Sequence, residues 1–92
     1  MSRFWLTYNQ SGRPRGVIIL DSSSLQDARM RASVDRIDHG TAFAKGYRLA
    51  KDAADLVPGK AIGRMLDPAE VAKLITRFAS GSRRRRGFVK LG

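Results

Sequence analysis

The residues best suited by type and spacing to binding chemistry are cations close to the end of the sequence. Guanidinium groups neutralise phosphates and release counterions, which gives a salt-sensitive affinity that does not depend on base sequence. An aromatic ring beside them can stack on an unpaired base. We therefore expect contact with DNA or RNA here, and a solvated segment with no specific role is the alternative. The residues concerned are Arg83, Arg84, Arg85, Arg86, Phe88 and Lys90.

A second group of cations lies near the beginning of the sequence. Residues 9–16 are rich in turn-forming residues, so they predict a long basic loop that carries Arg13 and Arg15. Arg3 begins the neighbouring predicted strand. A basic hairpin loop can follow a nucleic-acid groove, so these three arginines are further candidate contacts. An ordinary solvated loop, with Pro14 and Gly16 present for turn geometry, is the competing interpretation.

Catalytic patterns are absent from the sequence. His39 is the only histidine and there is no cysteine, so neither a histidine cluster nor a thiolate metal site is available. The serines at 22–24 lack the glycines of a nucleophile elbow, and Gly59-Lys60 is followed by Ala61 where a phosphate loop requires Ser or Thr. The sequence therefore predicts a non-enzymatic protein with no metal and no cofactor.

The charge balance is strongly positive. The 92 residues carry 18 Lys and Arg against 8 Asp and Glu, a formal net charge of +10. Half of that excess lies in residues 81–92, which contain no acidic side chain. Such a charge attracts polyanions and carries no information about fold. The longest apolar run, 17–20, is far too short to enter a membrane, so we expect a cytoplasmic protein without membrane insertion. An arginine-rich composition without cysteine also suggests a bacterial source.

The elements that position these residues follow from periodicity and end signals. Alternation predicts strands, and apolar residues spaced three and four apart predict helices. Asp67 and Pro68 are a helix cap and a first helical residue, and they precede the clearest amphipathic stripe, which begins at Val71. The sequence predicts strands at 3–8, 17–20 and 42–49, helices at 25–37 and 68–80, a short helix at 52–57 and a helical turn at 61–66.

This order predicts a small α+β fold of the type ββαβ(α)α. A β-hairpin and one further strand would form an antiparallel sheet of about three strands in the order 2-1-3, because connections are short. Two main helices would cover one face of the sheet. We expect residues 1–80 to form a single domain and 81–92 to form a flexible basic tail.

The predicted hairpin is apolar on both faces, which raises the question of what covers the second face. One helical layer covers only one face of a sheet, so we expect a second chain, residues 52–66 or a ligand to cover the other. Trp5, Ile18 and Leu20 are the candidate interface residues if a second chain is responsible. A homodimeric interaction module is therefore the alternative to a nucleic-acid-binding protein.

Overall fold

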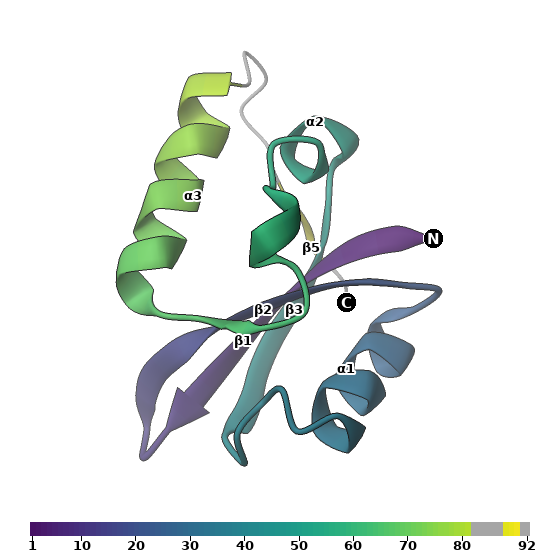
Figure 1. The fold of residues 1–92 in the computed structure, drawn as a ribbon, viewed down its shortest axis with the longest axis vertical. Coiled ribbons are helices and arrows are strands. Elements are labelled where there is room, and N and C mark those ends of the chain that lie inside the picture. Colours follow the sequence, from purple (N-terminus) through teal and green to yellow (C-terminus); the bar gives the residue numbers. More distant parts are fainter. Residues whose placement is uncertain (82–87, 91–92) are drawn as a thin grey trace.

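The computed structural model describes residues 1–81 and 88–90 of the chain. It confirms the α+β class, with five antiparallel strands in the order β4-β2-β1-β3-β5 and helices on the sheet (Figure 1). The predicted 2-1-3 order of the first three strands is correct, and two short strands extend the sheet at its edges. The elements are β1 Ser2–Gln10, β2 Arg13–Ser22, α1 Leu25–Val34, β3 Ala42–Leu49, α2 Lys51–Ala54, the 3-10 turn η1 Gly59–Ala61, β4 Met65–Leu66, α3 Pro68–Gly81 and β5 Phe88–Lys90.

The hairpin turn is much shorter than the sequence predicts. Only Ser11 and Gly12 separate β1 from β2, and both have left-handed backbone conformations, with φ of 54° and 77°. Positive φ at both turn residues matches the right-handed twist of the flanking strands. The expected basic loop is therefore wrong, because Arg13 and Arg15 belong to β2, where a register shift opposite Tyr8 and Asn9 accommodates one extra residue.

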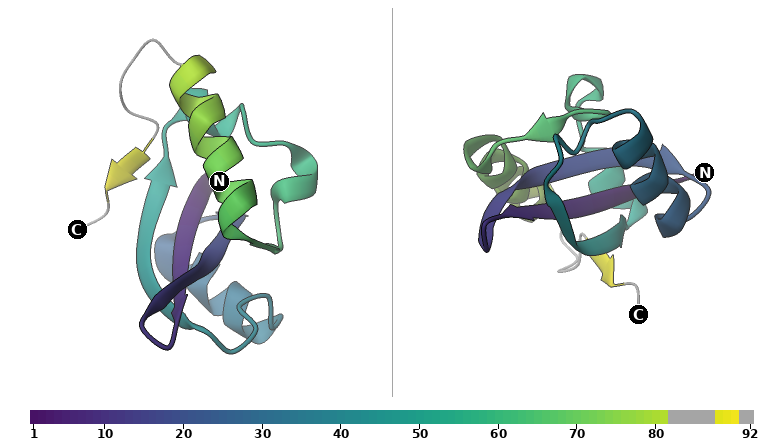
Figure 2. Two further views of the ribbon diagram at one scale, coloured as in Figure 1. Left: turned by 90° about the vertical axis from the view of Figure 1, so that its left-hand side faces the viewer. Right: turned by 90° about the horizontal axis from the view of Figure 1, so that it is seen from below.

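The helices cover both faces of the sheet, which corrects the expectation of a single helical layer. Figure 2 shows α3 and α1 on opposite sides of the strands. On one side, Ala28 and Ala32 of α1 pack on Phe4, Leu6 and Ile18. On the other, α3 and the segment from α2 to β4 enclose a second cluster, which contains Trp5, Val17, Ile19, Leu49, Ala53, Val57, Ala61, Leu66, Leu74 and Phe78.

The three candidate interface residues lie inside these two clusters. The exposed fractions of Trp5, Ile18 and Leu20 are 4%, 0% and 4%. The Trp5 ring meets Phe78 of α3 edge-on, with ring centroids 5.8 Å apart. The chain therefore covers both faces of its own hairpin, and these three side chains are buried within one chain.

Two glycines allow close approach of other elements to the sheet. A Cβ at Gly16 in β2 would lie 2.3 Å from the carbonyl oxygen of Leu66, so the hydrogen bonding of β4 along β2 requires glycine there. A Cβ at Gly46 in β3 would lie 2.4 Å from a methyl group of Leu25, which packs down onto the strand from α1. A glycine is therefore present within the strand predicted at 42–49 because a larger residue would collide with Leu25.

α1 is shorter than the predicted helix at 25–37. It begins at the N-cap Ser24, whose side chain accepts a hydrogen bond from the Asp27 amide, and it ends at Val34. Arg36 and His39 then adopt left-handed conformations, with φ of 57° and 52°. Gly40 follows with a φ of 75°, and these left-handed residues redirect the chain toward β3.

The segment between α2 and α3 differs from the expected helical turn at 61–66. Residues 59–61 form η1, and Met65–Leu66 forms β4, which pairs with Val17 and Ile18 of β2. At the other edge, Phe88–Lys90 forms β5 and pairs with Tyr47, Arg48 and Leu49 of β3. These three residues lie within the segment that the sequence suggested as a flexible tail.

Candidate nucleic-acid interface

Arg3 connects three elements at one end of the sheet. Its Nε donates to Oδ1 of Asp21 at 2.7 Å, and its Nη2 donates to Oδ2 of the same carboxylate at 3.0 Å. Its Nη1 donates to the carbonyl oxygen of Ala54, also at 2.7 Å, which ties α2 to β1 and β2. The hydrogen bond and charge of Arg3 hold the pKa of Asp21 below its usual value, although partial burial opposes this.

The guanidinium of Arg3 is thus occupied by partners within the chain. All three of its nitrogens donate to groups of the protein, which uses three of the five guanidinium N–H donors. The structure therefore gives Arg3 a structural role, and the nucleic-acid contact that the sequence suggested for it stays a prediction.

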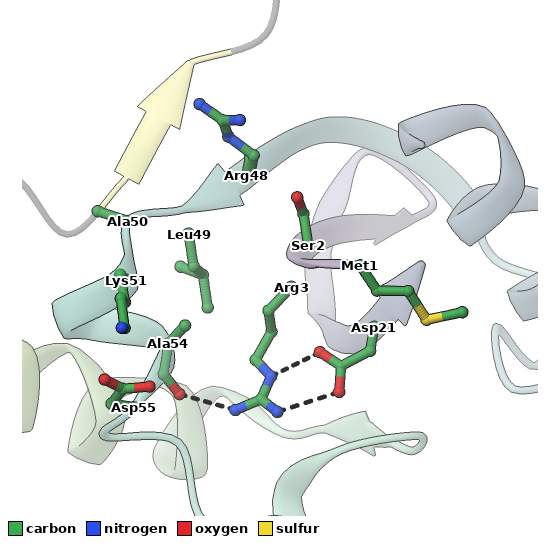
Figure 3. A pocket seen from close by; sticks show the side chains of 10 residues that line it. All are labelled: Met1, Ser2, Arg3, Asp21, Arg48, Leu49, Ala50, Lys51, Ala54 and Asp55. Carbon is green, nitrogen blue, oxygen red and sulfur yellow. Dashed lines mark hydrogen bonds and ion pairs between the residues drawn. The ribbon is translucent and has the colours of Figure 1, made fainter. Parts of the chain in front are cut away.

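An open pocket of about 600 Å³ surrounds the Arg3–Asp21 pair (Figure 3). Its lining comes from the start of β1, the end of β2 and the β3–α2 junction. Figure 3 shows Arg3 pointing toward Asp21 and Ala54, whereas Arg48 points away from that pair. The charged groups of the lining are Arg3, Arg48, Lys51, Asp21 and Asp55.

Arg48 and Lys51 are the free cations of this pocket. Both are exposed, and neither side chain forms a hydrogen bond or an ion pair with any residue that the structure describes. They differ in this from Arg3, and the sequence analysis did not single them out. The alternation of side chains along the predicted strand could have indicated Arg48. It lies between Tyr47 and Leu49, so its side chain points to the opposite face of the sheet from theirs.

Two of the candidate residues near the end of the sequence, Phe88 and Lys90, belong to β5 and lie beside Arg48 in the sheet. Phe88 pairs with Leu49 and Lys90 pairs with Tyr47 through the backbone of β5. Their side chains, and Arg83, Arg84, Arg85 and Arg86, lie outside the described part of the structure. The chain segment that carries the four arginines joins Gly81, at the end of α3, to Phe88.

The hairpin arginines lie at the opposite end of the sheet. Arg13 pairs with Gln10, seven positions along β1 from Arg3, and this corresponds to about 23 Å at the usual rise of a strand. Arg13 is exposed and Arg15 is half-buried. The candidate contacts therefore do not form one continuous group, because the hairpin tip and the β3–β5 end are separated by the length of the sheet.

The acidic side chains serve mainly local structure. Asp38, Asp52 and Asp67 accept hydrogen bonds from the backbone amides of Gly40, Ala53 and Glu70, and Asp27 accepts one from the hydroxyl of Ser22. Between described residues there are two ion pairs, Arg3–Asp21 and Arg64–Glu70. Most of the basic side chains therefore remain without a neutralising partner in this part of the chain.

The part of the chain that the structure describes contains no cluster of His, Cys, Asp and Glu side chains that could hold a metal ion. Within the same residues, none of the helices has the length and apolar character needed to cross a membrane. No protein-family model, no curated protein and no solved structure matches the chain, so no relative informs the assignment of this surface.

Proposed function

We propose that this protein is a non-enzymatic nucleic-acid-binding protein that contacts the phosphate backbone through cations around the β3–β5 end of the sheet. The observation that carries the proposal is the unneutralised charge. Of the 13 Lys and Arg side chains in residues 1–80, 11 form no ion pair with a described residue. Four more arginines follow in the segment that leads into β5.

The arrangement around β3 supports this location for the contact. Arg48 and Lys51 are three positions apart at the end of β3 and the start of α2, and both are exposed. β5 runs alongside Arg48, and its first residue, Phe88, follows the four arginines by two positions in the sequence. Closely spaced cations of this kind bind a polyphosphate more tightly than the same charges spread over the surface.

Removal of Arg48 and Lys51 tests this location. We would measure the binding of a fluorescein-labelled DNA duplex and an RNA strand by anisotropy at two salt concentrations, with the full chain and with the double variant Arg48→Gln, Lys51→Gln. Each phosphate contact contributes about 0.9 to the slope of log affinity against log salt for duplex DNA. The double variant is expected to lose affinity. For duplex DNA, the loss of two phosphate contacts should reduce the steepness of this slope by about 1.8.

A matched control removes the same charge elsewhere. Lys73 and Arg77 are exposed on α3 and, like those of Arg48 and Lys51, their side chains form no hydrogen bond or ion pair with a described residue. The variant Lys73→Gln, Arg77→Gln is expected to retain most of the affinity. Equal losses in the two variants would contradict the location, and absence of binding by the wild-type chain in dilute buffer would contradict the function.

A further inference from the structure

A stacked group of side chains lies between α1 and the start of β3, away from the pocket of Figure 3. The guanidinium carbon of Arg29 lies 3.9 Å from the centroid of the Phe43 ring. Phe43 in turn meets the buried ring of Tyr8 edge-on, with centroids 5.8 Å apart. Burial raises the pKa of Tyr8 and the Asp38 carboxylate adds to this, while Arg29 opposes it. Arg29 itself is exposed, so its stacking on Phe43 takes place at the surface.

This group borders two adjoining depressions. The first, of about 370 Å³, is lined by the stacked side chains together with Gln26, Met30, Ser33 and Asp38. The second, of about 590 Å³, is lined by residues of the α1–β3 connection, including Arg36 and His39. Ser33 and Asp38 line both, so the two depressions meet at these residues.

The first depression has the chemistry that an unpaired nucleobase requires. Bases stack on aromatic rings and on arginine planes, and both are present in the Arg29–Phe43 pair. Met30 is 63% exposed and adds a polarisable apolar side chain to the rim. The side chains of Gln26, Ser33 and Asp38 provide hydrogen-bond donors and acceptors for the edge of a base.

The second depression presents groups that suit a phosphate contact beside the Asp38 carboxylate, whose Oδ1 accepts a hydrogen bond from the Gly40 amide. Arg36 and His39 are exposed and present N–H donors, and neither forms a hydrogen bond through its side chain to a described residue. Both have left-handed backbone conformations, with φ of 57° and 52°, which are costly for residues with a side chain. Backbone hydrogen bonds from Ile37 and Asp38 to the Ala32 carbonyl, at 2.9 and 3.2 Å, help to hold this connection in place.

We propose that these two depressions bind one nucleotide unit of a single-stranded nucleic acid, with the base stacked against Arg29 and Phe43 and a neighbouring phosphate at Arg36 and His39. The inference rests on the proposed nucleic-acid-binding function and adds a preference for single strands to it. In a duplex the bases are paired and stacked, so they cannot enter such a site without being extruded.

The test compares single-stranded and duplex oligonucleotides of the same length with two charge-conserving variants. Arg29→Lys keeps the positive charge but removes the planar group that stacks. Arg77→Lys makes the same change on α3 and serves as the control. Arg29→Lys is expected to weaken single-strand binding about tenfold, which is within the range for the loss of one stacked base, and to leave duplex binding within about twofold. Arg77→Lys is expected to leave both unchanged.

A second measurement separates failure of this site from failure of the proposed function. Adenosine carries no phosphate, so its binding does not depend on polyanion attraction. In the isotope-labelled full chain, adenosine is expected to shift the NMR resonances of the Phe43 ring and the Arg29 Nε–H group. If oligonucleotides bind but adenosine leaves these resonances unchanged and Arg29→Lys behaves like Arg77→Lys, the site is refuted and the phosphate-binding function remains. If no oligonucleotide binds, the proposed function is refuted whether or not adenosine shifts the resonances. If neither oligonucleotides nor adenosine binds, the site is refuted as well.

Discussion

Arg3 and Asp21 lie directly opposite each other in the β1–β2 ladder, and their side chains form a two-point ion pair with nitrogen–oxygen distances of 2.7 and 3.0 Å. The third guanidinium nitrogen binds the carbonyl of Ala54. One cation therefore joins the first two strands to α2. This geometry explains why a residue that the sequence offered as a nucleic-acid contact contributes to the fold.

The Arg3–Asp21 pair makes stability depend on pH in the acid range. The pKa of Asp21 is lower in the folded chain than in the unfolded chain, where it is about 3.9. The ion pair therefore stabilises the folded state fully above about pH 3.9, and this stabilisation is lost as the pH falls from there through the folded-state pKa. Because Asp21 is 41% exposed, solvent reduces this contribution to about 1 kcal/mol or less. Between pH 7 and pH 3, Asp21→Asn is expected to lose less unfolding free energy than the wild type, measured by urea denaturation. Asp35→Asn, at an exposed position, is the control, and an equal pH dependence in wild type and Asp21→Asn would contradict this role of the pair.

Gly16 is expected to be the least replaceable of the described glycines that lack a positive φ. A methyl group there would lie 2.3 Å from the Leu66 carbonyl oxygen, and backbone atoms of β4 cannot move aside as a side chain can. Gly16→Ala should therefore destabilise the protein by about 1 to 3 kcal/mol, the usual range for overpacking. Gly59→Ala meets no atom within 4 Å and should be neutral or slightly stabilising. Chemical denaturation of both variants decides the matter, and a neutral Gly16→Ala would show that β4 does not lie on β2 in this way.

Local patterns in the sequence carried enough information for the main elements. The alternation of apolar residues along β1 and the cap at Asp67 depend on neighbouring residues alone, so both were predicted correctly. β4 could not be predicted in the same way, since Met65–Leu66 is a strand only because β2 passes beside it. β5 is likewise a three-residue strand that exists through its pairing with β3.

The candidate site was harder to predict because it depends on register. The predicted long loop at 9–16 does not define which residue of β2 lies opposite Arg3. In the structure, the two-residue turn at Ser11 and Gly12, together with one extra residue in β2, places Asp21 opposite Arg3. The contact between Arg29 and Phe43 also joins residues 14 positions apart on different elements. Neither relationship follows from composition or periodicity, which describe each element separately.

Trp5 gives a direct test of whether one chain completes its own core. It is the only tryptophan, it is 4% exposed, and it lies against Phe78 within one chain. Its fluorescence emission is therefore expected to be that of a buried indole and to stay constant on dilution. Light scattering at the same concentrations would establish the mass of the species observed. A shift of the emission toward longer wavelength as the protein dissociates on dilution would instead restore an interface role for Trp5.

The arginine block is expected to control how strongly binding depends on salt. Replacing Arg83, Arg84, Arg85 and Arg86 by Gln removes four charges and leaves the residues of β5 intact, whereas deletion of residues 82–92 also removes the strand that pairs with β3. If all four arginines contact phosphates of duplex DNA, the salt slope should fall by about 3.6, and it should fall less if only some do. The replacement variant should keep the wild-type stability, while the deletion should lower it through the loss of β5. An unchanged slope in the replacement variant would show that these arginines do not contact the nucleic acid.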